Sequence, residues 1–171
     1  NYWDESRAIL ITYGDSITGP PEPPLASLNE FVEQRLSDVI SDVHILPFFP
    51  SSSDDGFAVK DYLSVDGELG QWSDIELICE NRALLVDLVI NHCSSEHPWF
   101  EQFKSNASPG KDFFVEVDPL SDLSKVVRPR TSELLRETER EDGSSFVWCT
   151  FSHDQVDLDF ANPEVLKEMV S

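Results

Sequence analysis

Short apolar runs alternate with helical patterns along the first half of the chain. The runs at residues 8–13, 43–46 and 83–90 are bounded by polar residues, glycine or proline, which is typical of strands. Between the first two, residues 25–36 place apolar side chains three and four positions apart, as on one face of a helix. Residues 72–80 also read as a helix. This alternation predicts an α/β fold with a parallel sheet.

The stretch that organises the chain is residues 83–92. Its apolar run, interrupted by Asp87, ends in Asn91 and His92. A strand buried on both faces by helices has this appearance, and a carboxylate inside it must be hydrogen-bonded. We expect Asn91 and His92 at the carboxyl end of the strand, where α/β barrels collect their ligand-binding residues. His92 alone would be structural, but beside Asp87 and Asn91 it is a candidate functional residue.

The pattern changes after His92. A polar stretch of about sixty residues, punctuated by four prolines, is too long for an ordinary connection between a strand and a helix. We therefore predict an inserted subdomain over the carboxyl face, with a candidate strand at 145–151. A last helix begins at Asn162, a good cap, followed by Pro163 at its first position.

Length and charge limit the function classes. The 171 residues would make only part of a (β/α)8 barrel, which needs roughly 250 residues. We expect a fragment, open at both ends, that is inactive and marginally folded by itself. A net charge of −21 argues against nucleic-acid and anionic-membrane partners. No apolar run is long enough to cross a bilayer.

Cysteine and histidine spacing give no sign of a metal centre. The three cysteines show no paired spacing, which favours buried thiols in a reducing, cytoplasmic compartment over disulfides or zinc. We also predict no cofactor.

The loop at residues 46–57 is a second candidate site. It follows a predicted strand and combines aromatic rings, the adjacent carboxylates Asp54 and Asp55, and a glycine. Sugars bind to such sets, because aromatic rings stack on the sugar and carboxylates accept from its hydroxyls. An acidic surface loop is the alternative.

Two later segments also carry candidate residues. Arg128 and Arg130 could orient a carboxylate or phosphate through their forked donors, or Arg128 could neutralise acidic neighbours. Residues 151–160, which include Gln155, alternate acidic and apolar positions. By itself this segment reads as a solvated edge.

Taken in order, six segments resemble the sucrose phosphorylase subfamily of the α-amylase family, glycoside hydrolase family 13. They are residues 43–50, 53–57, 68–72, 87–92, 127–130 and 155–158. The subfamily includes sucrose, sucrose 6-phosphate and glucosylglycerate phosphorylases. Asp54-Asp55 and Asp112-Phe113-Phe114 are closer to the glucosylglycerate type.

The resemblance implies the N-terminal part of a (β/α)8 TIM barrel with a subdomain inserted after the third strand. Residues 1–92 would supply the first three β/α units, 93–160 the subdomain, and 161–171 a truncated return into the barrel. The family transfers glucose from an α-glucoside to phosphate with retention, through a covalent glucosyl-enzyme. Its nucleophile and acid/base lie on later strands, so this segment contains no catalytic residue.

The resemblance also implies roles in half of a glucose pocket. Asp54 would accept from glucosyl hydroxyls, Phe57 would pack on the sugar, and His92 would donate to a hydroxyl. Asp87 would brace the pocket, and Arg130 and Gln155 would lie near the acceptor sugar or phosphate. No metal is implied.

Two alternatives remain open at this point. One is a hydrolase or transglucosidase of the same family, and the other is a non-catalytic amylase-like binding subunit. The expected partners are an α-glucoside and inorganic phosphate, and a homodimer is compatible with the sequence.

Overall fold

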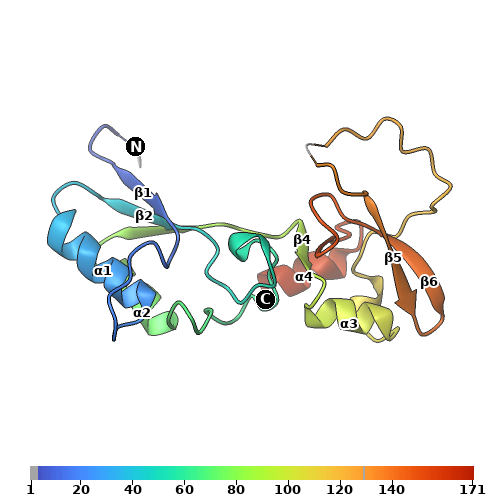
Figure 1. Cartoon of the computed structure of the whole chain (residues 1–171), viewed down its shortest axis with the longest axis horizontal. Helices are drawn as coiled ribbons and strands as arrows, with labels where there is room; N and C mark the ends of the chain where they lie inside the picture. The colour runs from blue at the N-terminus through green and yellow to red at the C-terminus, as the bar shows by residue number, and fades with distance from the viewer. Residues whose placement is uncertain (1–3, 129) are drawn as a thin grey trace. The chain divides into compact units, whose positions relative to one another are not determined.

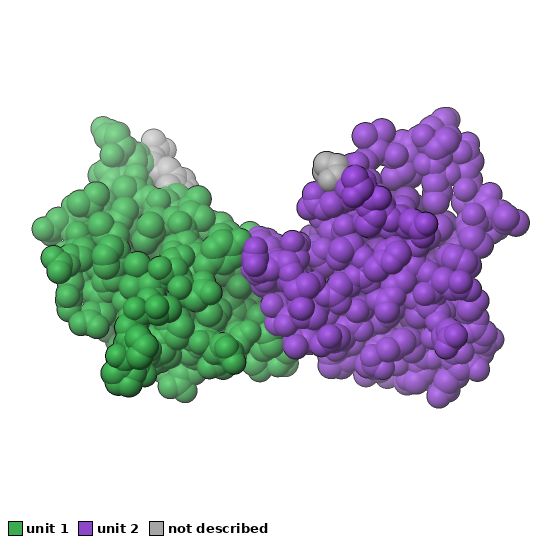
Figure 2. Space-filling view, viewed as in Figure 1, with its two compact units in different colours: residues 1–50, 61–88 green, residues 51–60, 89–171 purple. Residues whose placement is uncertain are grey.

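The structure is a computed structural model that describes residues 4–128 and 130–171. The chain divides into two compact units, shown in Figure 2. Unit 1 comprises residues 1–50 and 61–88, and unit 2 comprises 51–60 and 89–171. The loop 51–60 therefore belongs to unit 2, although the chain on both sides of it belongs to unit 1.

Unit 1 is built on a parallel sheet, as predicted. Strands β1 (Ile9–Thr12), β2 (Asp42–Ile45) and β3 (Ala83–Val86) follow the order β1-β2-β3 (Figure 1). The register pairs Ile9 with Asp42 and Asp42 with Ala83. All three strands therefore end at the same edge of the sheet, which is the arrangement that βαβ units produce.

Two helices connect the strands and supply the core of unit 1. They are α1 (Pro24–Arg35) and α2 (Trp72–Cys79), which pack against each other. Proline at the start of α1 suits the first turn, where its missing N–H is not needed. Their apolar faces meet the sheet in one buried cluster, formed by Leu25, Leu28, Val32, Val43, Ile45, Phe48, Val65, Ile75 and Ile78.

The third predicted strand is shorter than the sequence indicates. β3 ends at Val86, and His92 begins a separate strand, β4 (His92–Ser94), in unit 2. The prediction that the apolar run 83–90 forms one strand, with Asn91 and His92 at its carboxyl end, is therefore wrong. So is the prediction that it is buried on both faces, because Val86 is 48% and Leu88 is 75% exposed. In Figure 1, α1 and α2 lie on the same side of the sheet.

Unit 2 contains two antiparallel ladders and two short helices. β4 pairs with β7 (Gln155–Asp157), and β5 (Leu135–Arg140) pairs with β6 (Gly143–Trp148). The predicted strand at 145–151 thus exists, shifted toward the N-terminus. The helices are α3 (Pro98–Lys104) and α4 (Pro163–Val170). As predicted, α4 is capped by Asn162, whose side chain accepts from Glu164 N.

Aromatic rings form the centre of unit 2. Phe100 and Phe103 stack with their centroids 5.6 Å apart, and both meet Phe114 edge-on. Such contacts add to the area that the rings bury. Cys93 and Cys149 are also buried, whereas Cys79 of unit 1 is exposed, so the prediction of buried thiols is wrong for Cys79. All three thiols are free.

No helix within the described ranges is both long enough and apolar enough to span a bilayer.

Gly110 gives a stability prediction for unit 2. A Cβ there would lie 2.3 Å from the carbonyl oxygen of Trp99, a backbone atom that cannot turn aside. We expect Gly110→Ala to lower the free energy of unfolding by about 1–3 kcal/mol, as overpacking does, measured by urea denaturation. Gly67→Ala is the control, because a Cβ at Gly67 meets no atom within 4 Å. The control should leave stability unchanged or slightly higher, and equal stability of the two variants would contradict the expected clash.

Candidate functional site

The β4–β7 ladder gathers polar side chains on one face. Its register pairs His92 with Asp157 and Ser94 with Gln155, and directly opposed residues share a face. The alternate positions, Cys93 and Val156, are fully buried on the other face. The two-residue period of a strand therefore presents an imidazole, a hydroxyl, an amide and a carboxyl together.

A tight turn brings a second set of residues to this face. Asp54 to Gly56 form one turn of 3-10 helix, with φ values of 57° at Asp54, 50° at Asp55 and 99° at Gly56. Glycine adopts such values freely and aspartate more readily than most residues. A run of left-handed residues is unfavourable unless its surroundings hold it, and such strain is typical of functional sites.

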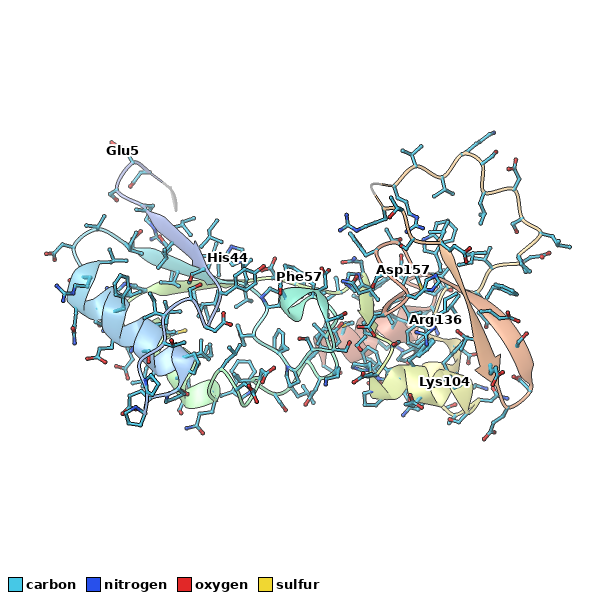
Figure 3. The ribbon with its side chains drawn as sticks, viewed as in Figure 1. Glu5, His44, Phe57, Lys104, Arg136 and Asp157 are labelled. Carbon is cyan, nitrogen blue, oxygen red and sulfur yellow. The ribbon has the colours of Figure 1, made fainter. Side chains whose placement is uncertain are left out.

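Direct contacts join the turn to the ladder. Gln155 Nε2 donates to Asp54 Oδ2 at 2.8 Å and lies 3.2 Å from His92 Nε2. His92 Nε2 is 3.0 Å from the carbonyl oxygen of Phe57, and Ser152 Oγ donates to Gln155 Oε1 at 3.0 Å. Four of the six predicted site residues thus form one cluster. Figure 3 labels Phe57 and Asp157 from this unit.

His92 is the buried centre of the cluster, with 4% of its surface exposed. Burial lowers its pKa from 6.5, against the opposing effects of the Phe57 carbonyl and of Asp157 and Asp54. The imidazole is therefore neutral at pH 7. A carbonyl only accepts, so the shorter contact of Nε2, to Phe57, requires the proton on Nε2, and Nδ1, 2.7 Å from Asn91 Nδ2, is then the acceptor. In this tautomer the Gln155 amide nitrogen, at 3.2 Å, is a neighbour of Nε2 and not its hydrogen-bond donor. A ligand hydroxyl must share or replace the Phe57 carbonyl to receive this proton.

Asp157 supplies a second buried ionisable group. Burial raises its pKa, although the hydrogen bonds from the amide and hydroxyl of Thr150 oppose the shift. Arg128 donates to the carbonyl oxygens of Thr150 and Ser132. Arg128 therefore joins the segments of Ser132 and Thr150 by hydrogen bonds, and its charge acts on Asp157 to lower the pKa of that carboxyl.

Arg130 lies next to the cluster through an aromatic ring. Its guanidinium carbon is 5.3 Å from the ring centroid of Phe151, a cation–π distance. The same ring lies 5.1 Å from the imidazole of His92. Arg130 is exposed, so its charge is accessible to an anion near the cluster. Residue 129, between the two arginines, lies outside the described residues.

Asp87 belongs to unit 1. It directly follows β3, and its Oδ2 is 2.9 Å from Nε2 of His44 in β2. We predicted that this carboxylate is hydrogen-bonded, and its partner is a histidine on the neighbouring strand. Its convergence with the cluster of unit 2 stays a prediction.

Sequence reasoning missed several residues of segment 151–160. It treats the segment as a solvated edge, yet Gln155 and Val156 are at most 2% exposed. Phe151, Asp154 and Asp157 all contribute contacts that the sequence argument does not assign. The signal was the period-two alternation of Gln155 and Asp157 with Val156 and Leu158, which indicates a strand with one buried face.

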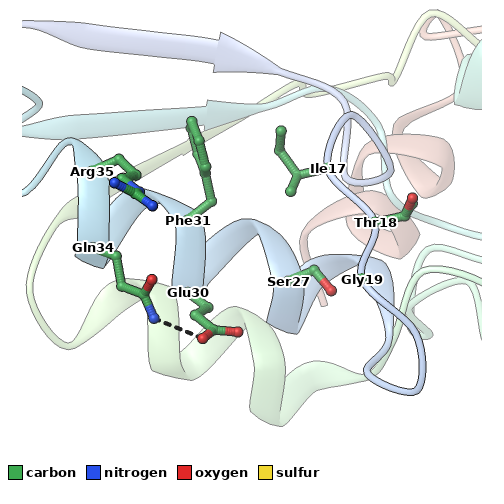
Figure 4. A pocket seen from close by; sticks show the side chains of 8 residues that line it. All are labelled: Ile17, Thr18, Gly19, Ser27, Glu30, Phe31, Gln34 and Arg35. Carbon is green, nitrogen blue, oxygen red and sulfur yellow. Dashed lines mark hydrogen bonds between the residues drawn. The ribbon is translucent and has the colours of Figure 1, made fainter.

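A separate hollow of about 250 Å³ lies beside α1 in unit 1 (Figure 4). Its lining residues are Ile17, Thr18, Gly19, Ser27, Glu30, Phe31, Gln34 and Arg35. Gln34 Nε2 donates to Glu30 Oε1, one turn earlier on α1, at 2.7 Å. This lining contains none of the predicted site residues. Across the described part of the chain, no three His, Cys, Asp or Glu side chains are grouped to hold a metal ion.

Comparison with known proteins places this geometry in context. The chain is 51% identical over 168 residues to a glucosylglycerate phosphorylase of Allomeiothermus silvanus, covering 98% of this chain and 30% of that protein. It is 45% identical over 170 residues to a glucosylglycerate phosphorylase of Escherichia coli, covering 99% of this chain and 30% of that protein. The chain thus spans about a third of the length of the curated relatives it matches.

A solved structure shows the same fold. It is sucrose 6F-phosphate phosphorylase from Thermoanaerobacter thermosaccharolyticum, with a TM-score of 0.86 and 34% identity, covering 98% of this chain and 36% of that one. This confirms the predicted fold class, the N-terminal part of a (β/α)8 barrel with an insertion. The family description "Alpha amylase, catalytic domain" matches residues 39–171. Because that match covers well over half of the sequence, the chain belongs to the α-amylase catalytic-domain family.

Proposed function

We propose that the whole protein containing this segment is a retaining glucosyl phosphorylase of the glucosylglycerate type. The observation that carries the proposal is the cluster in which Gln155 holds the exposed carboxylate of Asp54 beside His92 and Phe57. Two relatives named glucosylglycerate phosphorylase, 51% and 45% identical to this chain, support the choice of substrate. The substrates are then an α-glucoside and inorganic phosphate.

Each predicted site residue has a role in this proposal. A carboxylate offers about four lone-pair sites, so Asp54 can accept from sugar hydroxyls while it holds Gln155. Phe57 packs on the sugar ring, His92 donates from Nε2, and Asp87 braces the pocket. Arg130 attracts the phosphate or a carboxylate of the acceptor. The nucleophile and the acid/base lie outside residues 1–171.

The reaction is a double displacement. The bond from the glucosyl C1 to the leaving oxygen breaks as a carboxylate attacks C1, and the leaving alcohol takes a proton. Phosphate oxygen then attacks C1 and releases the carboxylate, which gives α-glucose 1-phosphate with retained configuration.

The domain division at residues 92 and 160 and a cytoplasmic location are parts of the same proposal. The three free cysteines support a reducing compartment.

The test is phosphate dependence. Purified whole protein is incubated with α-glucosylglycerate, with and without phosphate, and products are followed by phosphorus and proton NMR. We expect α-glucose 1-phosphate and free glycerate only when phosphate is present, at least about tenfold faster than with sucrose, a selectivity that polar contacts to the leaving group can supply. Free glucose formed equally with and without phosphate would mean a hydrolase. No turnover of any glucoside would mean a binding subunit.

A further inference from the structure

A carboxylate beside the cluster collects hydroxyl groups from two segments of unit 2. Ser52 Oγ donates to Asp154 Oδ2 at 2.6 Å, and Ser53 Oγ donates to the same oxygen. Ser95, just after β4, donates to Asp154 Oδ1 at 2.7 Å. Ser52 Oγ is also 2.6 Å from Ser94 Oγ. We call Asp154 with these four serines the Asp154 latch.

The latch runs parallel to the contact that builds the cluster. Ser53 precedes Asp54 in the chain, and Asp154 precedes Gln155. The hydrogen bond from Ser53 to Asp154 therefore joins the same two segments as the bond from Gln155 to Asp54, whose residues are 101 positions apart in the chain. Two neighbouring hydrogen bonds fix both the separation and the relative orientation of these two segments, whereas one hydrogen bond would fix only their separation.

The turn at Asp54 needs such support. Asp54 and Asp55 both adopt left-handed backbone conformations, which are unfavourable for residues with a side chain. Within the turn, the backbone bond from Phe57 N to Asp54 O is 3.0 Å, and that from Ala58 N to Ser53 O is 3.3 Å. Ser52 N also donates to Ala58 O at 3.0 Å, and the latch adds side-chain bonds from Ser52 and Ser53 on the N-terminal side of the turn.

Charge strengthens the latch. Burial tends to raise the pKa of Asp154, but the hydroxyls of Ser52, Ser53 and Ser95 and the nearby Arg136 outweigh it, so the pKa is lowered. The carboxylate is therefore ionised at pH 7, and hydrogen bonds to an ionised acceptor are stronger than neutral ones. Arg136 is itself fixed by its bond to the carbonyl oxygen of His153, at 2.6 Å.

We propose that Asp154 is a positioning residue that, through Ser52 and Ser53, holds the carboxylate of Asp54 in its sugar-binding position. This proposal rests on the proposed function for the identity of the sugar substrate. The carboxylate of Asp154 is bonded to serine hydroxyls, so it acts through Ser52 and Ser53 and not on the sugar itself. The latch sets the fraction of molecules in which the turn has the conformation that binds sugar. Weakening the latch should therefore raise KM for the glucosyl donor more than it lowers kcat.

Asp154→Asn in the whole protein tests the proposal. Asparagine has the same shape but replaces one accepting oxygen with an NH2 group and removes the charge. We expect KM for the donor to rise about tenfold, the effect of losing charge-assisted hydrogen bonds. Hydrogen exchange at the amides of Ser52, Phe57 and Ala58 should accelerate by a similar factor, because these amides are bonded only while the turn is formed.

Three further variants separate positioning from general stabilisation. Ser53→Ala removes a hydroxyl on the turn side of Asp154 and should reproduce part of both effects. Ser95→Ala removes one on the β4 side and should have less than half the effect of Ser53→Ala. Asp122→Asn removes the charge of an exposed carboxylate that accepts a hydrogen bond from the amide of Ser124 in its own turn, and should change neither readout.

KM and hydrogen exchange together distinguish failure of the proposed function from failure of the proposed role of Asp154. If wild-type protein shows no phosphorolysis of any glucoside, the proposed function fails, while faster exchange in Asp154→Asn at Ser52, Phe57 and Ala58 would still support the latch. If the wild type is active but Asp154→Asn leaves KM and exchange unchanged, the latch is overturned. Equal effects of Ser95→Ala and Ser53→Ala on KM would also overturn it, because Asp154 would then act through the fold as a whole.

Discussion

Replacing Asp54 with asparagine in the whole protein should lower kcat/KM for the glucosyl donor by about a hundredfold. Asparagine tolerates the left-handed conformation at this position, where φ is 57°, so the backbone of the turn is retained. What is lost is an ionised acceptor for sugar hydroxyls, and hydrogen bonds to charged groups contribute about 1.5–3 kcal/mol each. The measurement is initial-rate kinetics at saturating phosphate.

Asp55→Asn is a matched control for this variant. Asp55 is the neighbouring residue, also left-handed at φ 50°, and its replacement removes the same charge from the same turn. Asp55 is not one of the cluster residues, so kcat/KM should change less than about threefold, as expected of a long-range surface charge. Similar losses in the two variants would show that the acidic turn acts only by its total charge, and would contradict the assigned role of Asp54.

Replacing His92 with alanine should lower kcat by about a hundredfold while KM changes little. His92 is neutral and its single donor, Nε2, points toward the Phe57 carbonyl at the cluster. A donor to a sugar hydroxyl strengthens its bond as the ring approaches an oxocarbenium-like transition state, so its loss falls mainly on turnover. Steady-state kinetics across donor concentrations separates the two constants.

The control for His92→Ala is His153→Ala. His153 is exposed and its ring bonds to the carbonyl oxygen of Glu133, so its removal tests the loss of an imidazole from unit 2 outside the cluster. Because His92 is buried, both variants are assayed well below their measured unfolding temperatures. Unchanged kcat in folded His92→Ala would show that the histidine serves only the fold.

The helices of unit 1 could be predicted from the sequence because their information is local. Apolar residues three and four apart gave the helix at 25–36, close to the observed Pro24–Arg35. The proline before this segment predicts a helix start, and the apolar run that follows predicts a strand next. Both agree with the helical spacing, and a local prediction is more reliable when independent signals agree.

The end of β3 could not be predicted, because it depends on which partner each residue meets. The apolar run continues to Ile90, yet the ladder stops at Val86, where β2 ends at Ile45. His92 pairs instead with Asp157, far along the chain. Hydrophobic periodicity carries no information about such partners.

The latch was invisible for a related reason. Serines 52 and 53, Ser95 and Asp154 each read as ordinary loop residues, and their hydrogen bonds become apparent only when distant segments meet. The predicted cluster of Asp54, Phe57, His92 and Gln155 came from the family resemblance, and the contacts among these residues are what the structure adds.

The assignment of loop 51–60 to unit 2 has a consequence for the order of folding. The contacts that order unit 1 are comparatively local, as between Ala8 and Ser41, 33 residues apart, whereas Ser52 and Asp154 are 102 residues apart. Each doubling of a closed loop costs about 0.6 kcal/mol of chain entropy, and long-range contacts slow folding. The parallel sheet should therefore form first, and the turn at residues 54–56 should become protected late, when β7 has paired with β4. In pulse-labelling during refolding, the amides of Phe57 and Ala58 would then gain protection after those of β2, although they follow it by only about a dozen residues in the chain.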